Sequence, residues 1–137
     1  MSKRSSPKFA PSDKDKALPD VSLSKDGYAI KGRIWIEGPG GETFLGFGRV
    51  TLLQRIAEYG SISQAARSMG MSYKHAWDLV DSMNRNAGRL LVETSTGGKG
   101  GGGARLTDAG REAIRTFWEL YERFKGFLKK EAEKFIF

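Results

Sequence analysis

The stretch GSISQAARSMGMSYKHAWDLVDSMN, residues 60–84, contains the start signals of two helices separated by a short turn. Ser61 and Gln64 have the S-x-x-Q spacing of a capping box, and the small apolar residues after them predict a helix that ends at Gly70. Ser72 is a suitable N-cap for a second helix, in which alanine, valine and methionine recur at helical spacing. Two helices joined by a tight turn that contains glycine are typical of a helix-turn-helix.

The segments on either side predict the remaining elements of a winged helix. Upstream, residues 28–37 alternate as a half-buried strand does, and residues 49–59 carry one apolar stripe of a helix. Downstream, residues 89–96 and 104–107 predict two short strands around a glycine-rich loop, and a long helix follows over about residues 107–134. The fold class is therefore mainly α with a small β-sheet, a winged helix-turn-helix with a long C-terminal helix.

Residues 1–26 differ from the rest of the chain in composition. They hold three of the four prolines, many charged and serine residues, and only scattered apolar side chains. Such a segment buries too little surface to offset its chain entropy. We expect a disordered basic tail over residues 1–26 and one winged helix-turn-helix domain over residues 27–137.

The charge balance favours a polyanionic partner. Lys and Arg number 23 against 16 Asp and Glu, a net charge of +7, so nucleic acid is the first candidate partner and an anionic membrane the second. The chain has no cysteine and a single histidine, His75, and no catalytic arrangement stands out, so we expect no enzyme, no cofactor and no metal site. No apolar run approaches the ~18 residues of a membrane span, and the N-terminus lacks the apolar centre of a signal peptide, so we expect a cytoplasmic protein.

The first turn of the second helix holds the candidate base contacts. Ser72, Tyr73 and Lys74 lie there, where backbone N–H groups and the positive end of the helix dipole can meet phosphates and base edges. Lys74 is the strongest single candidate. The alternative is a three-helix core whose polar face is only solvated.

The next residues of this helix have simpler interpretations. A lone surface histidine such as His75 is more often solvated than bound to DNA, and Trp77 is expected to pack against the first helix or the wing. Asp78 and Asp81 would repel phosphate if they faced DNA. We expect Asp78 to pair with Lys74, four residues earlier, or with a nearby arginine.

The glycine-rich loop TGGKGGGG, residues 96–103, admits two interpretations. Glycines let the backbone approach a phosphodiester, and Lys99 can neutralise about one phosphate. A flexible linker is the alternative. A nucleotide-binding P-loop is disfavoured because Lys99 is followed by Gly100 and not by Ser or Thr, and because a further segment intervenes before the helix.

An aromatic and aliphatic stripe on the long C-terminal helix predicts a partner surface. Its members are Phe117, Trp118, Tyr121, Phe124 and Leu128. The stripe is longer than a three-helix core of this size can cover, so we expect a homodimer interface that presents two recognition helices to half-sites about 34 Å apart. The alternative is that the helix folds back over its own domain.

The motifs GSISQAARSMGMSYKHAWDLVDSMN and LLVETSTGGKGGGGARLTDAG, together with the opening strand, resemble the N-terminal DNA-binding domain of the ModE family of molybdate-responsive transcription regulators. The resemblance covers about residues 28–130 and implies a winged helix that binds operator DNA as a homodimer. The DNA contacts expected are Ser63, Gln64, Ser72, Tyr73 and Lys74, with Thr96, Gly98, Lys99 and Gly100 in the wing. Family members that sense molybdate carry an additional C-terminal oxyanion-binding module. The sequence ends at Phe137, so molybdate sensing is not carried over and the effector stays unknown.

The sequence thus predicts a homodimeric transcription regulator that binds double-stranded DNA sequence-specifically. Two alternatives retain the winged-helix fold: a protein-interaction module and a non-specific nucleic-acid-binding module. A third, an enzyme that binds nucleotide in the glycine loop, would show saturable ATP or GTP binding, which we do not expect.

Overall fold

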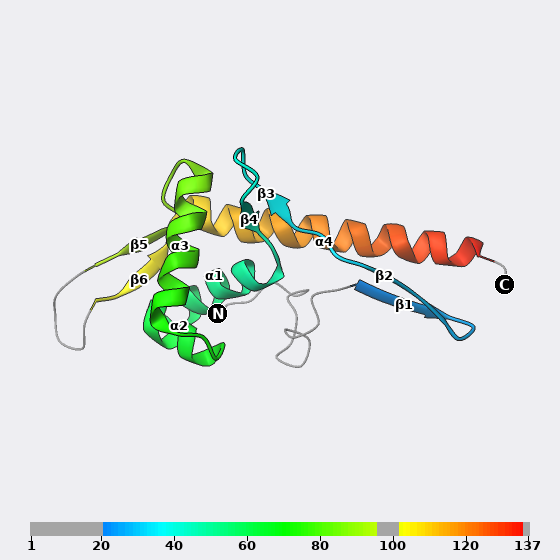
Figure 1. Ribbon diagram of the computed structural model, residues 1–137, viewed down its shortest axis with the longest axis horizontal. Coiled ribbons are helices and arrows are strands. Elements are labelled where there is room, and N and C mark those ends of the chain that lie inside the picture. The colour runs from blue at the N-terminus through cyan, green and yellow to red at the C-terminus, as the bar shows by residue number, and fades with distance from the viewer. Residues whose placement is uncertain (1–20, 96–101, 136–137) are drawn as a thin grey trace.

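The computed structural model describes residues 21–95 and 102–135. Its elements are β1 (Val21–Lys25), β2 (Tyr28–Gly32), β3 (Ile36–Glu37), β4 (Thr43–Leu45), α1 (Phe47–Tyr59), α2 (Ile62–Ser68), α3 (Tyr73–Ala87), β5 (Val92–Thr94), β6 (Ala104–Leu106) and α4 (Asp108–Lys134). The strands pair antiparallel as β1–β2, β3–β4 and β5–β6. Helices α1 to α3 and the β5–β6 hairpin gather around one end of α4, and β1–β2 runs beside its other end (Figure 1). The predicted fold class is confirmed.

Both helices of the predicted helix-turn-helix start where their capping residues lie. The Ser61 hydroxyl accepts a hydrogen bond from the Gln64 N–H at 3.1 Å, and the Ser72 hydroxyl accepts one from the His75 N–H at 3.0 Å. Three small side chains, Ala65, Ala66 and Ala76, are fully buried or nearly so. Because these side chains are small, α2 and α3 can pack closely, which fixes the angle of the motif.

The first half of α4 completes the core. Trp118 is fully buried, with the ring of Phe47 packed edge-on at 6.0 Å and its Nε1–H donated to the Gln54 side chain at 3.0 Å. Phe117 is 1% exposed. The prediction that Phe117 and Trp118 belong to a dimer interface is therefore wrong for these two side chains, because the chain's own core encloses them.

The N-terminal boundary of the domain lies earlier in the chain than predicted. Val21–Lys25, placed in the tail by composition, forms β1 and pairs with β2, so residues 21–26 are wrongly assigned to a tail. Lys25 pairs with Tyr28 across a two-residue loop, Asp26–Gly27, whose φ angles of 52° and 84° are both positive. Such a turn matches the twist of a hairpin, and Gly adopts it without strain. Residues 1–20 lie outside the described part of the chain.

The predicted strand over residues 28–37 is two strands with different partners. β2 pairs with β1, whereas β3 pairs with β4, and the register shifts between Ile36 and Glu37. The alternation of side chains persists through the break, since Ile34 and Ile36 pack against the core while Trp35 is exposed. Because of this break, the β1–β2 hairpin packs on α4 while the β3–β4 hairpin packs on α3.

The β1–β2 hairpin covers the second half of α4. A side chain added at Gly32 would meet the ring of Phe124 at 2.6 Å and Leu128 at 3.4 Å, so β2 lies directly on these two half-buried residues. The Lys25 ammonium donates to the backbone oxygens of Ala132 and Glu133 at 3.3 and 3.1 Å, near the C-terminus of α4. A cation at this end of a helix is stabilising. Of the helices described, none combines the length and apolar character needed to cross a membrane.

Candidate nucleic-acid interface

The first turn of α3 is exposed, as the sequence predicts. Ser72, Tyr73 and Lys74 all face solvent, and so do Ser63 and Gln64 on the preceding helix. The opposite face of α3 is fixed in the core by three buried side chains, Ala76, Val80 and Met83. The periodicity of the helix therefore leaves its N-terminal turn exposed at the surface.

Two side-chain pairs connect the first turn of α3 to the second. The Lys74 ammonium lies 3.0 Å from the Asp78 carboxylate, which confirms the predicted i,i+4 pair. The Trp77 indole N–H donates to the Tyr73 hydroxyl, also four residues away. Lys74 remains 86% exposed in its side chain, so its charge is available at the surface.

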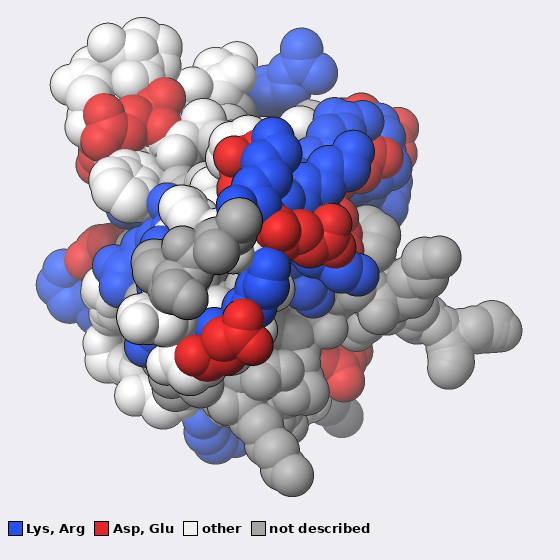
Figure 2. Space-filling view, turned by 90° about the vertical axis from the view of Figure 1, so that its right-hand side faces the viewer, with Lys and Arg blue, Asp and Glu red and all other residues white. Residues whose placement is uncertain are grey.

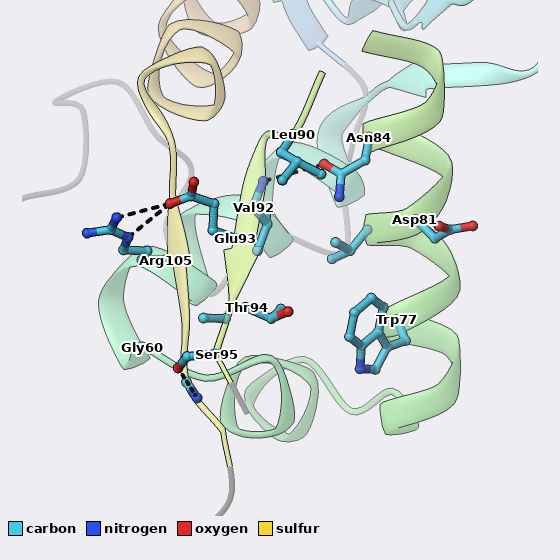
Figure 3. A pocket seen from close by; sticks show the side chains of 13 residues that line it. Gly60, Trp77, Asp81, Asn84, Leu90, Val92, Glu93, Thr94, Ser95 and Arg105 are labelled. Atoms are coloured by element: carbon cyan, nitrogen blue, oxygen red, sulfur yellow. Dashed lines mark hydrogen bonds and ion pairs between the residues drawn. The ribbon is translucent and has the colours of Figure 1, made fainter. Parts of the chain in front are cut away.

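A groove of about 810 Å³ separates α3 from the β5–β6 hairpin. Side chains from both elements face each other across it (Figure 3). The α3 wall is formed by Trp77, Val80, Asp81 and Asn84, and the opposite wall by residues 92–95 and 103–105. The second helix of the motif and the hairpin therefore lie side by side. Trp77 is half-buried against the core, and its indole faces the hairpin across the groove.

Hydrogen bonds fix the base of the hairpin to the helical motif. The Asn84 side-chain oxygen accepts from the Leu91 N–H at 2.7 Å, immediately before β5. The Ala104 N–H donates to the Gly60 carbonyl at 3.0 Å, which attaches β6 to the turn between α1 and α2. The Ser95 N–H donates to the Gly103 carbonyl at 3.0 Å where the loop begins. The predicted wing contacts Thr96, Gly98, Lys99 and Gly100 lie outside the described residues.

Two acidic residues that belong to the groove walls are paired with arginines, and their carboxylates point away from the space between α3 and the hairpin (Figure 3). Asp81 on α3 lies 3.1 Å from Arg85, and Glu93 on β5 lies 3.1 Å from Arg105 on β6. These pairs reduce the repulsion that Asp81 and Glu93 would exert on a nearby phosphate. Arg67, in the last turn of α2, is an exposed cation on the helix-turn-helix that the sequence interpretation did not single out.

Positive charge is not confined to the end of the molecule that carries α3 and the β5–β6 hairpin. Figure 2 views the opposite end of the molecule, where α4 ends and β1–β2 packs, and Lys and Arg gather there with Asp and Glu among them. An exposed pair at this end is Lys134 with Glu131, 3.0 Å apart. Net charge alone therefore does not locate a binding surface, and the pairing of α3 with the hairpin is the more specific feature.

A polar network connects α3 to α1 and to the residue before β4. The Arg49 guanidinium donates to the buried Ser82 hydroxyl at 2.9 Å, and the Asn86 amide donates to the Ser82 carbonyl at 2.8 Å and the Glu42 carboxylate at 3.0 Å. Burial lowers the pKa of Arg49, and the hydrogen bond from Asn86 is the main reason that the pKa of Glu42 lies below its ordinary value. The only sequence signal for this network is that Ser82 and Asn86 lie four residues apart on one face of α3.

A helix-turn-helix whose second helix adjoins an anchored two-stranded hairpin defines a winged helix-turn-helix domain. Residues 47–111 match the family described as "Bacterial regulatory helix-turn-helix protein, lysR family". Three curated relatives are also similar to the chain. The chain is 52% identical over 69 residues to "DNA-binding transcriptional dual regulator ModE" of Escherichia coli (strain K12). The matched region covers 50% of this chain and 26% of that protein.

Two further relatives carry molybdenum in their descriptions. The chain is 48% identical over 80 residues to "Molybdenum transport protein ModE" of Herbaspirillum seropedicae, covering 58% of this chain and 30% of that protein. It is 47% identical over 73 residues to "Molybdenum-pterin-binding protein MopA" of Rhodobacter capsulatus, covering 53% and 28%. The chain is thus similar to ModE and MopA proteins over 50–58% of its own length, and it spans less than a third of the length of each of these relatives.

One solved structure is also similar, the crystal structure of ArgP from Mycobacterium tuberculosis. The match has a TM-score of 0.44 and 19% sequence identity, and it covers 61% of this chain and 30% of that chain.

Proposed function

We propose that the chain is a transcription regulator that binds double-stranded DNA sequence-specifically through α3 and the β5–β6 hairpin. The observation that carries this proposal is that an exposed, capped first turn of α3 and an anchored hairpin line one groove. The similarity to ModE regulators supports it. A regulator of this class acts in the cytoplasm, where its DNA lies.

The geometry accounts for both parts of such an interface. The major groove of B-DNA is about 12 Å wide and admits an α-helix, whose N-terminal residues then reach base edges. Tyr73 and Lys74 present a hydroxyl and an ammonium there, and Ser63 and Gln64 on α2 present further polar groups. The described end of the hairpin, at Ser95 and Gly103, lines the same groove as α3 and lies next to the adjacent backbone in this proposal.

The domain acts as a homodimer in this proposal, with α4 as the contact. Two apolar side chains of α4 are exposed, Leu120 at 39% and Phe127 at 58%. They are seven residues apart and so lie on one face of the helix. Tyr121 packs against the core, and β2 lies on Phe124 and Leu128, so only the parts of these three side chains that stay exposed can contribute. A two-fold axis at α4 would present two α3 helices to half-sites about 34 Å apart.

DNA binding is tested by selecting bound genomic fragments and measuring the Kd for the selected duplex by fluorescence anisotropy. We expect binding to the selected site to exceed binding to random duplex by at least about 10³-fold. Lys74→Ala should weaken binding about tenfold or more, because a charge-assisted contact is lost. Lys129→Ala removes the same charge from an exposed position in the last turns of α4 and should change the Kd little.

The alternatives predict different results. A non-specific nucleic-acid-binding module would bind random duplex as tightly as any selected fragment, and both lysine variants would weaken it equally. A protein-interaction module would bind neither duplex measurably. Either result would overturn the proposed function.

The dimer is tested separately by light scattering coupled to size exclusion. Phe127→Glu places a charge on the exposed face of α4 and should yield a monomer with an unchanged Tm. A wild-type chain that is monomeric at tens of micromolar, with or without DNA, would contradict the proposed dimer but not the binding surface.

A further inference from the structure

We propose that Trp77 is a positioning residue, whose indole holds the phenol of Tyr73 so that the Tyr73 hydroxyl donates a hydrogen bond to DNA. The observation is the hydrogen bond from the Trp77 Nε1–H to the Tyr73 hydroxyl oxygen, which joins the first and second turns of α3. This inference rests on the proposed function and specifies the chemistry that one of its contact residues can recognise.

The direction of the hydrogen bond follows from the two groups. An indole N–H can only donate, whereas a phenol hydroxyl can donate and accept. The Tyr73 oxygen must therefore accept from Trp77, and its own proton is directed elsewhere. No residue in the described part of the chain accepts that proton, and Tyr73 is 54% exposed.

This arrangement makes Tyr73 selective for acceptors. Acceptors on DNA are phosphate oxygens and, in the major groove, N7 and O6 of guanine, N7 of adenine and O4 of thymine. The amino groups of cytosine and adenine are donors and would compete with Trp77 for the same oxygen. A Tyr73 held by Trp77 thus favours acceptor-rich edges over donor edges at the position it reaches.

The indole is itself held in place. Trp77 is half-buried in the α3 wall of the groove, across which the side chains of Thr94 and Ser95 lie (Figure 3). The Ser72 cap fixes the backbone of the turn that carries Tyr73. A phenol ordered before binding loses less rotamer freedom when the complex forms, so its contact adds more to affinity.

The test is a double-mutant cycle on the selected duplex with Tyr73→Phe and Trp77→Phe. We expect each single variant to raise the Kd about threefold to tenfold, the range of one hydrogen bond. The double variant should bind about as well as Tyr73→Phe alone, because Trp77 acts through Tyr73. Multiplicative losses in the double variant, or wild-type affinity in Trp77→Phe, would overturn the proposal.

Matched controls remove the same groups elsewhere. Trp35→Phe deletes an exposed indole N–H that donates to Glu37 at 3.1 Å on β3, and Tyr28→Phe deletes an exposed phenol hydroxyl on β2. Neither should change the Kd. The Tm of each variant is measured as well, so that a loss of folding is recognised.

The hydrogen bond between Trp77 and Tyr73 can be measured by NMR without DNA. In ¹⁵N-labelled protein, Tyr73→Phe should shift the Trp77 indole N–H signal and speed its exchange with water, while the Trp118 indole signal stays unchanged. An unaffected Trp77 signal means that the hydrogen bond does not exist in solution, which overturns the inference and leaves the proposed function standing. A shifted signal in a protein without specific DNA binding means that the proposed function has failed and the positioning role with it.

Discussion

The side-chain oxygen of Asn84 on α3 accepts a hydrogen bond from the backbone N–H of Leu91 at 2.7 Å, and the N–H of Val92 approaches the same oxygen at 3.4 Å. One amide of the second helix of the motif thus satisfies the backbone at the entry to the hairpin. Leu91 and Val92 are buried, so water could not replace the Asn84 oxygen as the acceptor for their N–H groups if that oxygen were removed. Asn84 therefore fixes the distance between the two halves of the proposed interface.

Asn84→Leu should lower the free energy of unfolding by about 1–3 kcal/mol, because it leaves buried backbone donors unsatisfied. It should also speed hydrogen exchange at the Leu91 amide and weaken binding to the selected duplex. Asn84→Asp keeps an acceptor at this position and should lose less stability. Equal destabilisation by Leu and Asp would show that the acceptor is not what holds the hairpin.

Two glycines of α4 should respond oppositely to the same substitution. A Cβ at Gly110 would come within 2.3 Å of the Leu91 carbonyl oxygen, a backbone atom that cannot turn aside, whereas none of the described atoms lies within 4 Å of a Cβ at Gly126. Gly110→Ala should therefore destabilise the fold by about 1–3 kcal/mol. Gly126→Ala should stabilise it by about 0.5–1 kcal/mol, since alanine loses less entropy in a helix. Denaturant unfolding of both variants measures the difference, and a stable Gly110→Ala protein would mean that α4 does not contact the backbone of Leu91 there.

Local signals were sufficient to predict the helical part of the fold. The caps at Ser61, Ser72 and Thr107 lie at the starts of α2, α3 and α4, and Gly60 and Gly88 end α1 and α3. Each of these signals acts through one or two hydrogen bonds within a few residues. They can therefore be recognised without any tertiary information.

Three features were not predicted from the sequence: the β1–β2 hairpin, the burial of Phe117 and Trp118, and the contact of Asn84 with the β5–β6 hairpin. The Asp26–Gly27 pair between two alternating runs is a strong hairpin signal, and it was obscured by the prolines and charges of the preceding segment. Phe117 and Trp118 carry the same helical pattern as the exposed residues of α4, and periodicity cannot tell which part of a stripe the chain's own core covers. The contact from Asn84 to β5 leaves no pattern at all.

Acid should weaken the contact of Glu42 with α3. The pKa of Glu42 is lowered from the ordinary 4.5, chiefly by the hydrogen bond from Asn86, so the folded state binds this proton less readily than the unfolded chain does. The contribution of Glu42 to stability is therefore present above its unfolded pKa and is lost as the pH falls through its folded pKa. Glu42→Gln should remove this part of the pH dependence, which thermal unfolding between pH 7 and 3 would measure. An unchanged acid limb in Glu42→Gln would rule out this group as a contributor.

Asp78 should weaken DNA binding because its carboxylate pairs with the Lys74 ammonium. Its carboxylate lies 3.0 Å from the Lys74 ammonium, and both side chains are largely exposed, at 64% and 86%. A phosphate or base edge that engages Lys74 must compete with this carboxylate and also meets its charge.

Asp78→Asn removes the negative charge and keeps the shape of the side chain. We expect it to tighten binding to the selected duplex and to random duplex alike, by about twofold to fivefold at 0.1 M salt, because the gain is electrostatic and carries no sequence information. The slope of log K against log salt should become steeper, since the freed ammonium displaces a further counterion. Glu131→Gln changes the net charge by the same amount beside Lys134 at the far end of α4 and should have a much smaller effect. An equal gain in both variants would mean that overall charge, and not the first turns of α3, governs the encounter with DNA.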